Sequence, residues 1–214
     1  MNVFLAILAA LPMTLLVTAA SFVVGALLAL PLMLGRRSRF AAVRMLAKLV
    51  IDVLRGIPPI VFVFILFFGV GSELIRMEPL AAAIVGLALI SAGHLAEAYR
   101  GGILAVPAGQ FEAASALGLG RVTTSVSVIG PQAVRTAIPA MVTWLISLLK
   151  DSSVVSAIGV AEMMFVTQQI ARTTGDGITP YLIAAAIYIL VGLPLAALAR
   201  WLVGRLSTGR REVR

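Results

Sequence analysis

The sequence predicts an all-α integral membrane protein with about five transmembrane helices. Hydrophobic residues make up 61% of the 214 residues and charged residues only 12%, proportions that lie outside the range of soluble proteins. The second observation is where the charges fall, because arginines and lysines gather between long apolar blocks that carry almost none. The net charge of +8 is therefore distributed along membrane edges, and we expect no nucleic-acid partner.

The apolar blocks are long enough, alone or with their flanking turns, to cross about 30 Å of hydrocarbon as helices. The first block contains Pro12 and Pro31 as expected kinks, and it lacks the charged start of a signal peptide, so we interpret it as a retained span. The segment KDSS at 150–153 interrupts the fourth block, which predicts a discontinuous helix. The expected spans of this single domain, residues 1–214, are 4–34, 56–72, 80–99, 138–166 and 180–200.

The basic residues predict the orientation of these spans. Segments 35–55 and 100–135 and the tail from residue 200 hold nearly all of the arginines and lysines, whereas the other loops hold only Arg76 and Arg172. Because loops rich in arginine and lysine stay in the cytoplasm, we expect the N-terminus outside and the C-terminus in the cytoplasm. The loop at about 104–137 is then cytoplasmic.

Composition and motifs exclude several chemistries. The chain has no cysteine and a single histidine, His94, so a thiolate or histidine metal cluster is excluded. Neither Lys48 nor Lys150 is followed by Ser or Thr, so there is no phosphate-binding loop for ATP. An enzyme within the membrane would need a nucleophile paired with a base, and no G-x-S-x-G motif occurs. We therefore expect no catalytic residue, cofactor or metal in this chain.

A polar stretch, QFEAASALGLGRVTTSVSVIGP, occupies residues 110–131 between the third and fourth blocks. Pro107 is a plausible helix start, and Gly118 and Gly120 are plausible stops. A helix of about three turns is marginal alone and needs a surface to pack on. Its alanines keep it thin and Phe111 offers one large anchor, which suits a groove on another protein. The alternative is an amphipathic connector on the membrane surface.

This stretch resembles the cytoplasmic EAA loop of permease subunits of ATP-binding-cassette (ABC) importers. In the family pattern Glu-Ala-Ala is followed after three residues by Gly, and after nine more by Ile-x-Leu-Pro. Val128 stands in place of the Ile, and Gly130 replaces the Leu. The positions that match the pattern are Glu112, Ala113, Ala114, Gly118 and Pro131.

Two flanking blocks narrow the resemblance to the polar amino-acid permeases of that superfamily. The segments RGIPPIVFVFILFFG and GPQAVRTAIPAMVTWLISLLKDSSVVSAIGVAEM are similar to family segments in the same order, so the resemblance runs from about Asp52 to Gln169. It implies a type I importer permease (MetI-like) fold with cytoplasmic coupling helices, in the bacterial inner membrane. The implied function is ATP-driven import of a polar or charged amino acid.

The resemblance also implies partners and contact residues. The partners would be a cytoplasmic ATPase dimer carrying ATP and Mg²⁺, a second permease subunit that is either a copy or a paralogue, an extracytoplasmic solute-binding protein, the amino acid and membrane lipid. The ATPase contact would involve Glu112, Ala113, Ala114, Leu117, Gly118 and Pro131.

Ionisable groups within spans are costly and are candidates for the solute path. Glu162 stands where the family has a Glu, and His94 stands where it often has a Tyr. The alternative for Lys150 and Asp151 is a local ion pair, and for His94 a hydrogen bond to a neighbouring helix. The path candidates are Lys150, Asp151, Ser153, Glu162 and His94.

A second functional class stays open from the residues alone. In a channel or secondary carrier that works without ATP, the charges within the spans would form an ion site and the polar loop would be a plain connector. An inverted repeat would favour a carrier, and none is visible in the sequence.

Overall fold

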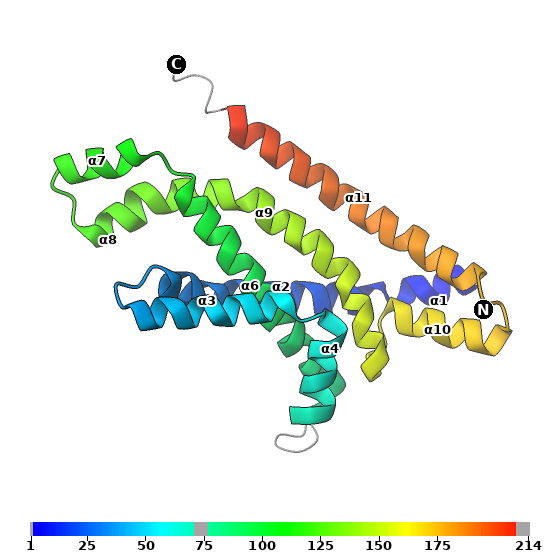
Figure 1. Cartoon of the computed structure of the whole chain (residues 1–214). Helices are drawn as coiled ribbons and strands as arrows, with labels where there is room; N and C mark the ends of the chain where they lie inside the picture. Colours follow the sequence, from blue (N-terminus) through cyan, green and yellow to red (C-terminus); the bar gives the residue numbers. More distant parts are fainter. Residues whose placement is uncertain (1, 71–76, 209–214) are drawn as a thin grey trace.

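The computed structural model describes residues 2–70 and 77–208, and in these ranges every regular element is helical (Figure 1). The helices of the first half are α1 (Val3–Ala9), α2 (Leu11–Arg36), α3 (Ala41–Gly56), α4 (Pro59–Phe64), the π-helix η1 (Ile65–Val70) and α6 (Pro79–Leu104). Those of the second half are α7 (Ala108–Ala116), α8 (Arg121–Thr123), the π-helix η2 (Thr124–Ile129), α9 (Gly130–Asp151), the 3₁₀-helix η3 (Ser152–Ile158), α10 (Met163–Thr174) and α11 (Thr179–Thr208).

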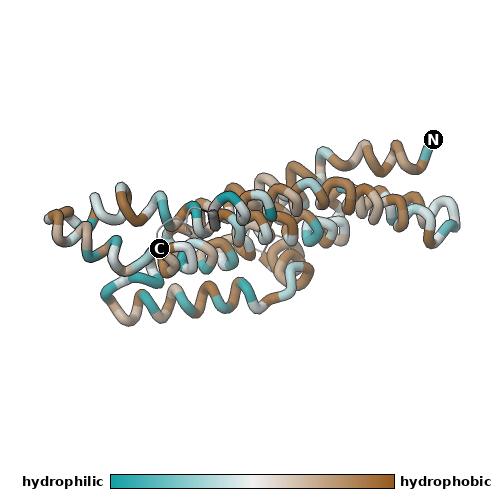
Figure 2. Tube along the Cα trace, turned by 90° about the horizontal axis from the view of Figure 1, so that it is seen from above, coloured by the Kyte–Doolittle hydropathy of each residue, from teal (hydrophilic) through white to brown (hydrophobic). Residues whose placement is uncertain are grey.

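The expectation of about five spans is confirmed. Four helical segments of the described residues are long and apolar enough to cross a membrane, namely Val3–Arg36, Pro79–Leu104, Arg121–Ile158 and Thr179–Leu202. A fifth is reached when α3 and the helix Pro59–Val70, which bend by 103° at the Pro58-Pro59 pair, are counted together as one broken span. Figure 2 shows hydrophobic residues along most of the long helices. Residues 71 and 72, the expected end of the second span, lie outside the described residues.

The fourth span differs from the sequence-based expectation in where it breaks. We expected Lys150 and Asp151 to interrupt it, but α9 continues past them into the tighter helix η3. The break comes at Gly159, whose φ of 91° is a left-handed conformation that glycine adopts without a Cβ clash. The span also begins before residue 138, because the helix starts upstream of Pro139 and tolerates that proline.

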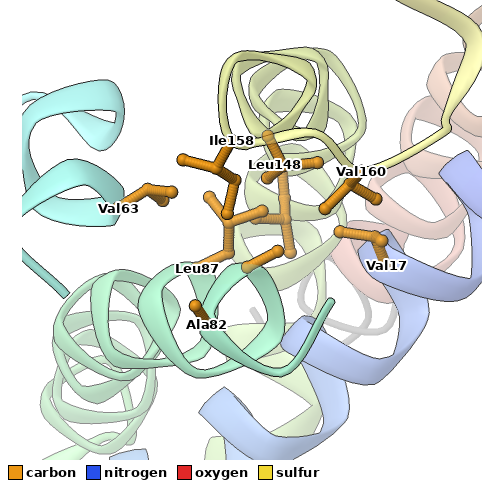
Figure 3. Packing of buried hydrophobic residues seen from close by; sticks show 9 residues of the cluster. Val17, Val63, Ala82, Leu87, Leu148, Ile158 and Val160 are labelled. Atoms are coloured by element: carbon orange, nitrogen blue, oxygen red, sulfur yellow. The ribbon is translucent and has the colours of Figure 1, made fainter. Parts of the chain in front are cut away.

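The interior is built from side chains of several spans. The largest cluster joins α2, α4, α6, α9, η3 and the turn that follows η3 (Figure 3). A second cluster joins α1, α10 and α11, and a third joins α2, α3 and α6. Because hydrocarbon offers no hydrophobic drive between helices, close packing holds these contacts together.

Small residues let α6 approach its neighbours closely. A Cβ added to Gly25 of α2 would lie 2.5 Å from the Cβ of Ser91 and 2.8 Å from the carbonyl oxygen of Ala88. Glycine is therefore required at Gly25 for the α2–α6 contact. Several other small residues of α6 are buried as well: Ala82, Ala83, Gly86, Ala92 and Gly93.

The two ends of the molecule carry different elements. In Figure 1, α7, α8 and the turn between α2 and α3 lie at one end, and the N-terminal helix and the α10–α11 turn lie at the other. In that turn the Asp176 carboxylate accepts hydrogen bonds from the backbone N–H groups of Thr179 (3.0 Å) and Ile178 (3.1 Å), which open α11. Hydrogen bonds from Thr179 and, to a lesser extent, from Ile178 stabilise the charged carboxylate. They therefore hold the pKa of Asp176 below its usual value.

Candidate functional site: a projecting helix and a pocket beside Lys150

Helix α7 forms where the polar loop was expected to be helical. Pro107 precedes it, and Gly118, with a φ of 67°, ends it. The chain turns there because the backbone N–H of Leu119 donates to the carbonyl of Ala114 at 3.0 Å. A Cβ at Gly118 would touch nothing within 4 Å, so glycine is needed for its conformation and not for space.

One side of α7 packs on its own chain, and the rest is open. Ala114 is 2% exposed and lies on the side of α7 that packs against η2, and the Gln132 side chain of α9 donates to Gln110 of α7 at 3.0 Å. Ala114 therefore faces the interior, although the sequence placed it in the contact with a partner. Every residue of α7 except Ala114 is exposed, including Phe111, Glu112, Ala113 and Ser115, and the adjoining Leu117 is 78% exposed.

The π-helix η2 accounts for Gly130, the residue that departs from the family pattern. The N–H of Gly130 donates to the carbonyl of Ser125, five residues earlier. A Cβ at Gly130 would lie 2.8 Å from that same oxygen, so a leucine would force this turn open. Pro131 follows without an N–H and stands in the first turn of α9, where proline is tolerated.

The serines after α9 satisfy the carbonyl groups at its end. Ser152 Oγ donates to the carbonyl of Leu149 and Ser153 Oγ to the carbonyl of Lys150, both at 2.8 Å. Within the described residues, Lys150 and Asp151 form no ion pair with each other or with another side chain. The Lys150 side chain is exposed, so its charge is open to a ligand.

Glu162 is fully buried at the start of α10. One carboxylate oxygen accepts the backbone N–H of Phe165 at 3.0 Å and so caps the helix. The other oxygen accepts the Tyr188 hydroxyl at 3.0 Å and the Thr14 hydroxyl at 3.3 Å. Thr14 in turn accepts the backbone N–H of Met163 at 3.1 Å. The carboxylate thus joins α2, α10 and α11, and its bonds are directed inward.

A pocket of about 300 Å³ lies between the end of α9, α10 and α11. Lys150 is the charged residue of the lining, Ser153, Tyr181 and Tyr188 carry hydroxyl groups, and the surface of the wall is mostly apolar. Because Tyr188 also binds Glu162, three of the sequence-predicted path residues meet here: Lys150 and Ser153 in the wall and Glu162 behind it. Asp151 and His94 are not in this wall. The lining residues are Lys150, Ser153, Met164, Tyr181, Ala184, Ala185 and Tyr188.

His94 lies elsewhere, against α9. Its ring stacks on Trp144 with 3.7 Å between centroids and 10° between planes. One turn further along α6, Glu97 accepts a hydrogen bond from Arg100 Nε at 2.8 Å, and Arg100 Nη2 lies 2.7 Å from the same oxygen in an ion pair. Arg36 of α2 places its Nε 3.6 Å from the same carboxylate. Glu97 therefore joins two arginines from different helices.

Sequence reasoning missed the partners of Glu162 and His94. Thr14 is 148 residues away from Glu162, and Tyr188 is 26 residues away in a different span. Neither Thr14 nor Tyr188 belongs to a recognisable motif. The one feature of the sequence that could have marked them as candidates is that each is a polar residue within an apolar span. The same signal could have marked Trp144, which we left out of the site.

Apolar spans, a short exposed helix at one end and a largely apolar pocket with one lysine between helices define a membrane-embedded transport subunit. Residues 21–208 match the family described as "Binding-protein-dependent transport system inner membrane component". The chain belongs to this family and is a permease subunit of an ABC importer.

Individual relatives agree with this assignment. The protein described as "Probable amino-acid ABC transporter permease protein YckA" from Bacillus subtilis is 38% identical, with 82% of this chain and 77% of YckA covered. A solved "amino acid ABC transporter with histidines" superposes with a TM-score of 0.87 at 32% identity over 94% of each chain. The inward-facing MetNI methionine transporter has a TM-score of 0.71 at 21% identity, also over 94% of each chain, and supports the fold alone.

Proposed function

We propose that this chain forms half of the solute path of an ATP-driven importer for a polar amino acid, and that α7 is its docking element for a cytoplasmic ATPase. The observation that carries the proposal is the open surface of α7, where Leu117 is 78% exposed beside Glu112 and Ala113. An exposed leucine on a short projecting helix costs free energy in water unless a groove covers it. Docking of α7 to a cytoplasmic ATPase requires the orientation expected from the basic residues. The N-terminus is then outside, and α7 and the C-terminus are cytoplasmic.

Movement of α7 can reach the pocket through a single rigid element. Packing on η2 and the bond between Gln110 and Gln132 attach α7 to the start of α9. Helix α9 then runs 22 residues, about 33 Å, to Lys150 at the pocket. Closure of two ATPase subunits on ATP and Mg²⁺ would move α7 and, through α9, the pocket wall. The ATPase hydrolyses ATP, and α7 and α9 of this chain transmit the resulting movement to the pocket.

The pocket fits the ends of an amino acid. The Lys150 ammonium suits a carboxylate, and the hydroxyls of Ser153 and Tyr188 can accept hydrogen bonds from an amino group. Glu162 acts behind Tyr188 by holding the wall in place. A second permease subunit, either a copy of this chain or a paralogue, would close the path, and an extracytoplasmic binding protein would deliver the solute.

The docking role is tested by replacing Leu117 with Asp in the full chain. Reconstituted with the ATPase and binding protein of its own transport system, the variant is expected to lose at least tenfold in solute-stimulated ATP hydrolysis, because burial of a carboxylate in an apolar groove costs several kcal/mol, about 1.4 kcal/mol per factor of ten. The matched control is Ile178→Asp, an equally open apolar position in the turn between α10 and α11. Equal hydrolysis in the two variants would refute docking through α7.

A further inference from the structure

A second group of polar side chains, which we call the polar seam, lies where α2, α3, α6 and α9 meet. His94 is ten residues before the end of α6, about 15 Å along the helix, so the seam reaches well into the membrane-spanning part. Charged groups at such a depth are costly and mark candidates for function. The polar seam comprises Arg36, Arg55, His94, Glu97, Arg100 and Trp144.

Arg55 is held against α6 by the absence of a side chain at Gly93. A Cβ at Gly93 would lie 3.1 Å from Arg55 Cγ and 3.1 Å from Leu54 Cβ. The arginine stem therefore crosses α6 closely at this point, next to His94 in the chain and on the same face of the helix as Glu97, four residues further on. Arg55 remains exposed overall, so a ligand can reach it.

The seam has a surplus of positive charge. The polar seam contains three guanidinium groups, those of Arg36, Arg55 and Arg100, and one carboxylate, that of Glu97, so positive charges exceed negative charges by two within this set. Glu97 is occupied by Arg100 and Arg36. Among the described residues no carboxylate pairs with Arg55. An anion would balance this charge.

Trp144 adds an unpaired hydrogen-bond donor to the polar seam. Its ring stacks on His94, which follows Gly93, and it packs against two of the hydrophobic clusters. The indole Nε1 is buried and finds no acceptor among the described residues. A buried donor without a partner costs about 1–3 kcal/mol of folding free energy. A bound ligand that supplies the acceptor would remove this cost.

We propose that the polar seam binds the carboxylate of the transported solute, with the guanidinium of Arg55 and the indole N–H of Trp144 as donors. The inference rests on the proposed transport function and adds a second station to the path. Trp144 is six residues before Lys150 on α9, about 9 Å along the helix and closer to the end that carries α7. A carboxylate that leaves Lys150 thus meets Arg55 next.

The chain allows a direct optical test, because it contains only two tryptophans. The Trp201→Phe variant of the full chain leaves Trp144 as the sole indole and keeps an aromatic ring beside Arg205. In nanodiscs of neutral phosphatidylcholine it is titrated with each common amino acid in turn, while Trp144 emission is followed. For each amino acid that responds, the decarboxylated amine is titrated as well. Arg55→Gln is compared with Arg172→Gln, an exposed arginine of α10.

At least one amino acid is expected to change Trp144 emission saturably, while its amine does not. Arg55→Gln should weaken this response about tenfold or more, as expected for loss of a charged hydrogen bond, and Arg172→Gln should leave it unchanged. Three results would overturn the proposal: no response to any amino acid, an equal response to the amine, or an unchanged response in Arg55→Gln. The titration contains no ATPase, so its result does not depend on whether α7 docks to one. The docking proposal is tested separately by Leu117→Asp.

Discussion

At the residue scale, Glu162 has a different task from the one its position in the sequence suggested. It was expected to contact the solute, yet its carboxylate lies inside the protein and accepts bonds from Thr14, Phe165 and Tyr188. Bonds to three elements make it a support for the pocket wall. A contact between this carboxylate and a solute would require at least one of these bonds to open.

Glu162→Leu is predicted to destabilise the folded chain by about 3 kcal/mol or more, because three buried donors lose their acceptor. For a domain of this size that corresponds to a fall in melting temperature of roughly 10 °C. Glu162→Gln retains an oxygen acceptor and should cost less. Melting in detergent, followed by circular dichroism, measures the effect.

The matched control for this prediction is Glu78→Leu, at an exposed residue just before α6. It should melt within a few degrees of the parent chain. Equal melting temperatures for Glu162→Leu and Glu78→Leu would show that the buried bonds contribute nothing.

At the element scale, the sequence predicted the helices well and their irregular parts poorly. The length of apolar blocks identifies spans, because hydrocarbon demands about 20 residues. Segment 150–153 was read as a break, but serine hydroxyls cap the carbonyls there and the helix continues as η3. The helix breaks at Gly159, whose φ is positive. The sequence alone does not show which glycine in a helical pattern has a positive φ. The π-turn at Gly130 was equally invisible before its neighbours were placed.

The contact between α2 and α6 is predicted to depend on Gly25. Gly25→Ala places a Cβ within 3 Å of Ser91 and Ala88, so the helices must separate. The expected cost is about 1–3 kcal/mol, although alanine is the better helix former. Gly192→Ala in α11 meets nothing within 4 Å and serves as control. The melting temperature should fall for the first variant only, and a rise for both would contradict the close packing.

At the scale of the whole molecule, the fold separates two ends joined by long helices. α7 is at one end and the turn between α10 and α11 at the other (Figure 1). The pocket and the polar seam lie between them, on α9 and its neighbours. Because a helix transmits displacement along its axis, this arrangement allows a movement of α7 to displace both the pocket and the polar seam.

The orientation of the ends can be measured directly, since the chain contains no cysteine. Single cysteines at Ser115 in α7 and at Gly177 before α11 are both on exposed positions. A membrane-impermeant maleimide should label Ser115→Cys only in inverted vesicles and Gly177→Cys only in intact spheroplasts. The opposite pattern would reverse the topology inferred from the basic residues.

The most direct test of the central claim is solute uptake by proteoliposomes that contain the full chain, with its ATPase and binding protein supplied or withheld. The account predicts that accumulation requires ATP and the ATPase, and that removal of either abolishes it. Uptake that persists without the ATPase would contradict the account and favour a channel or secondary carrier.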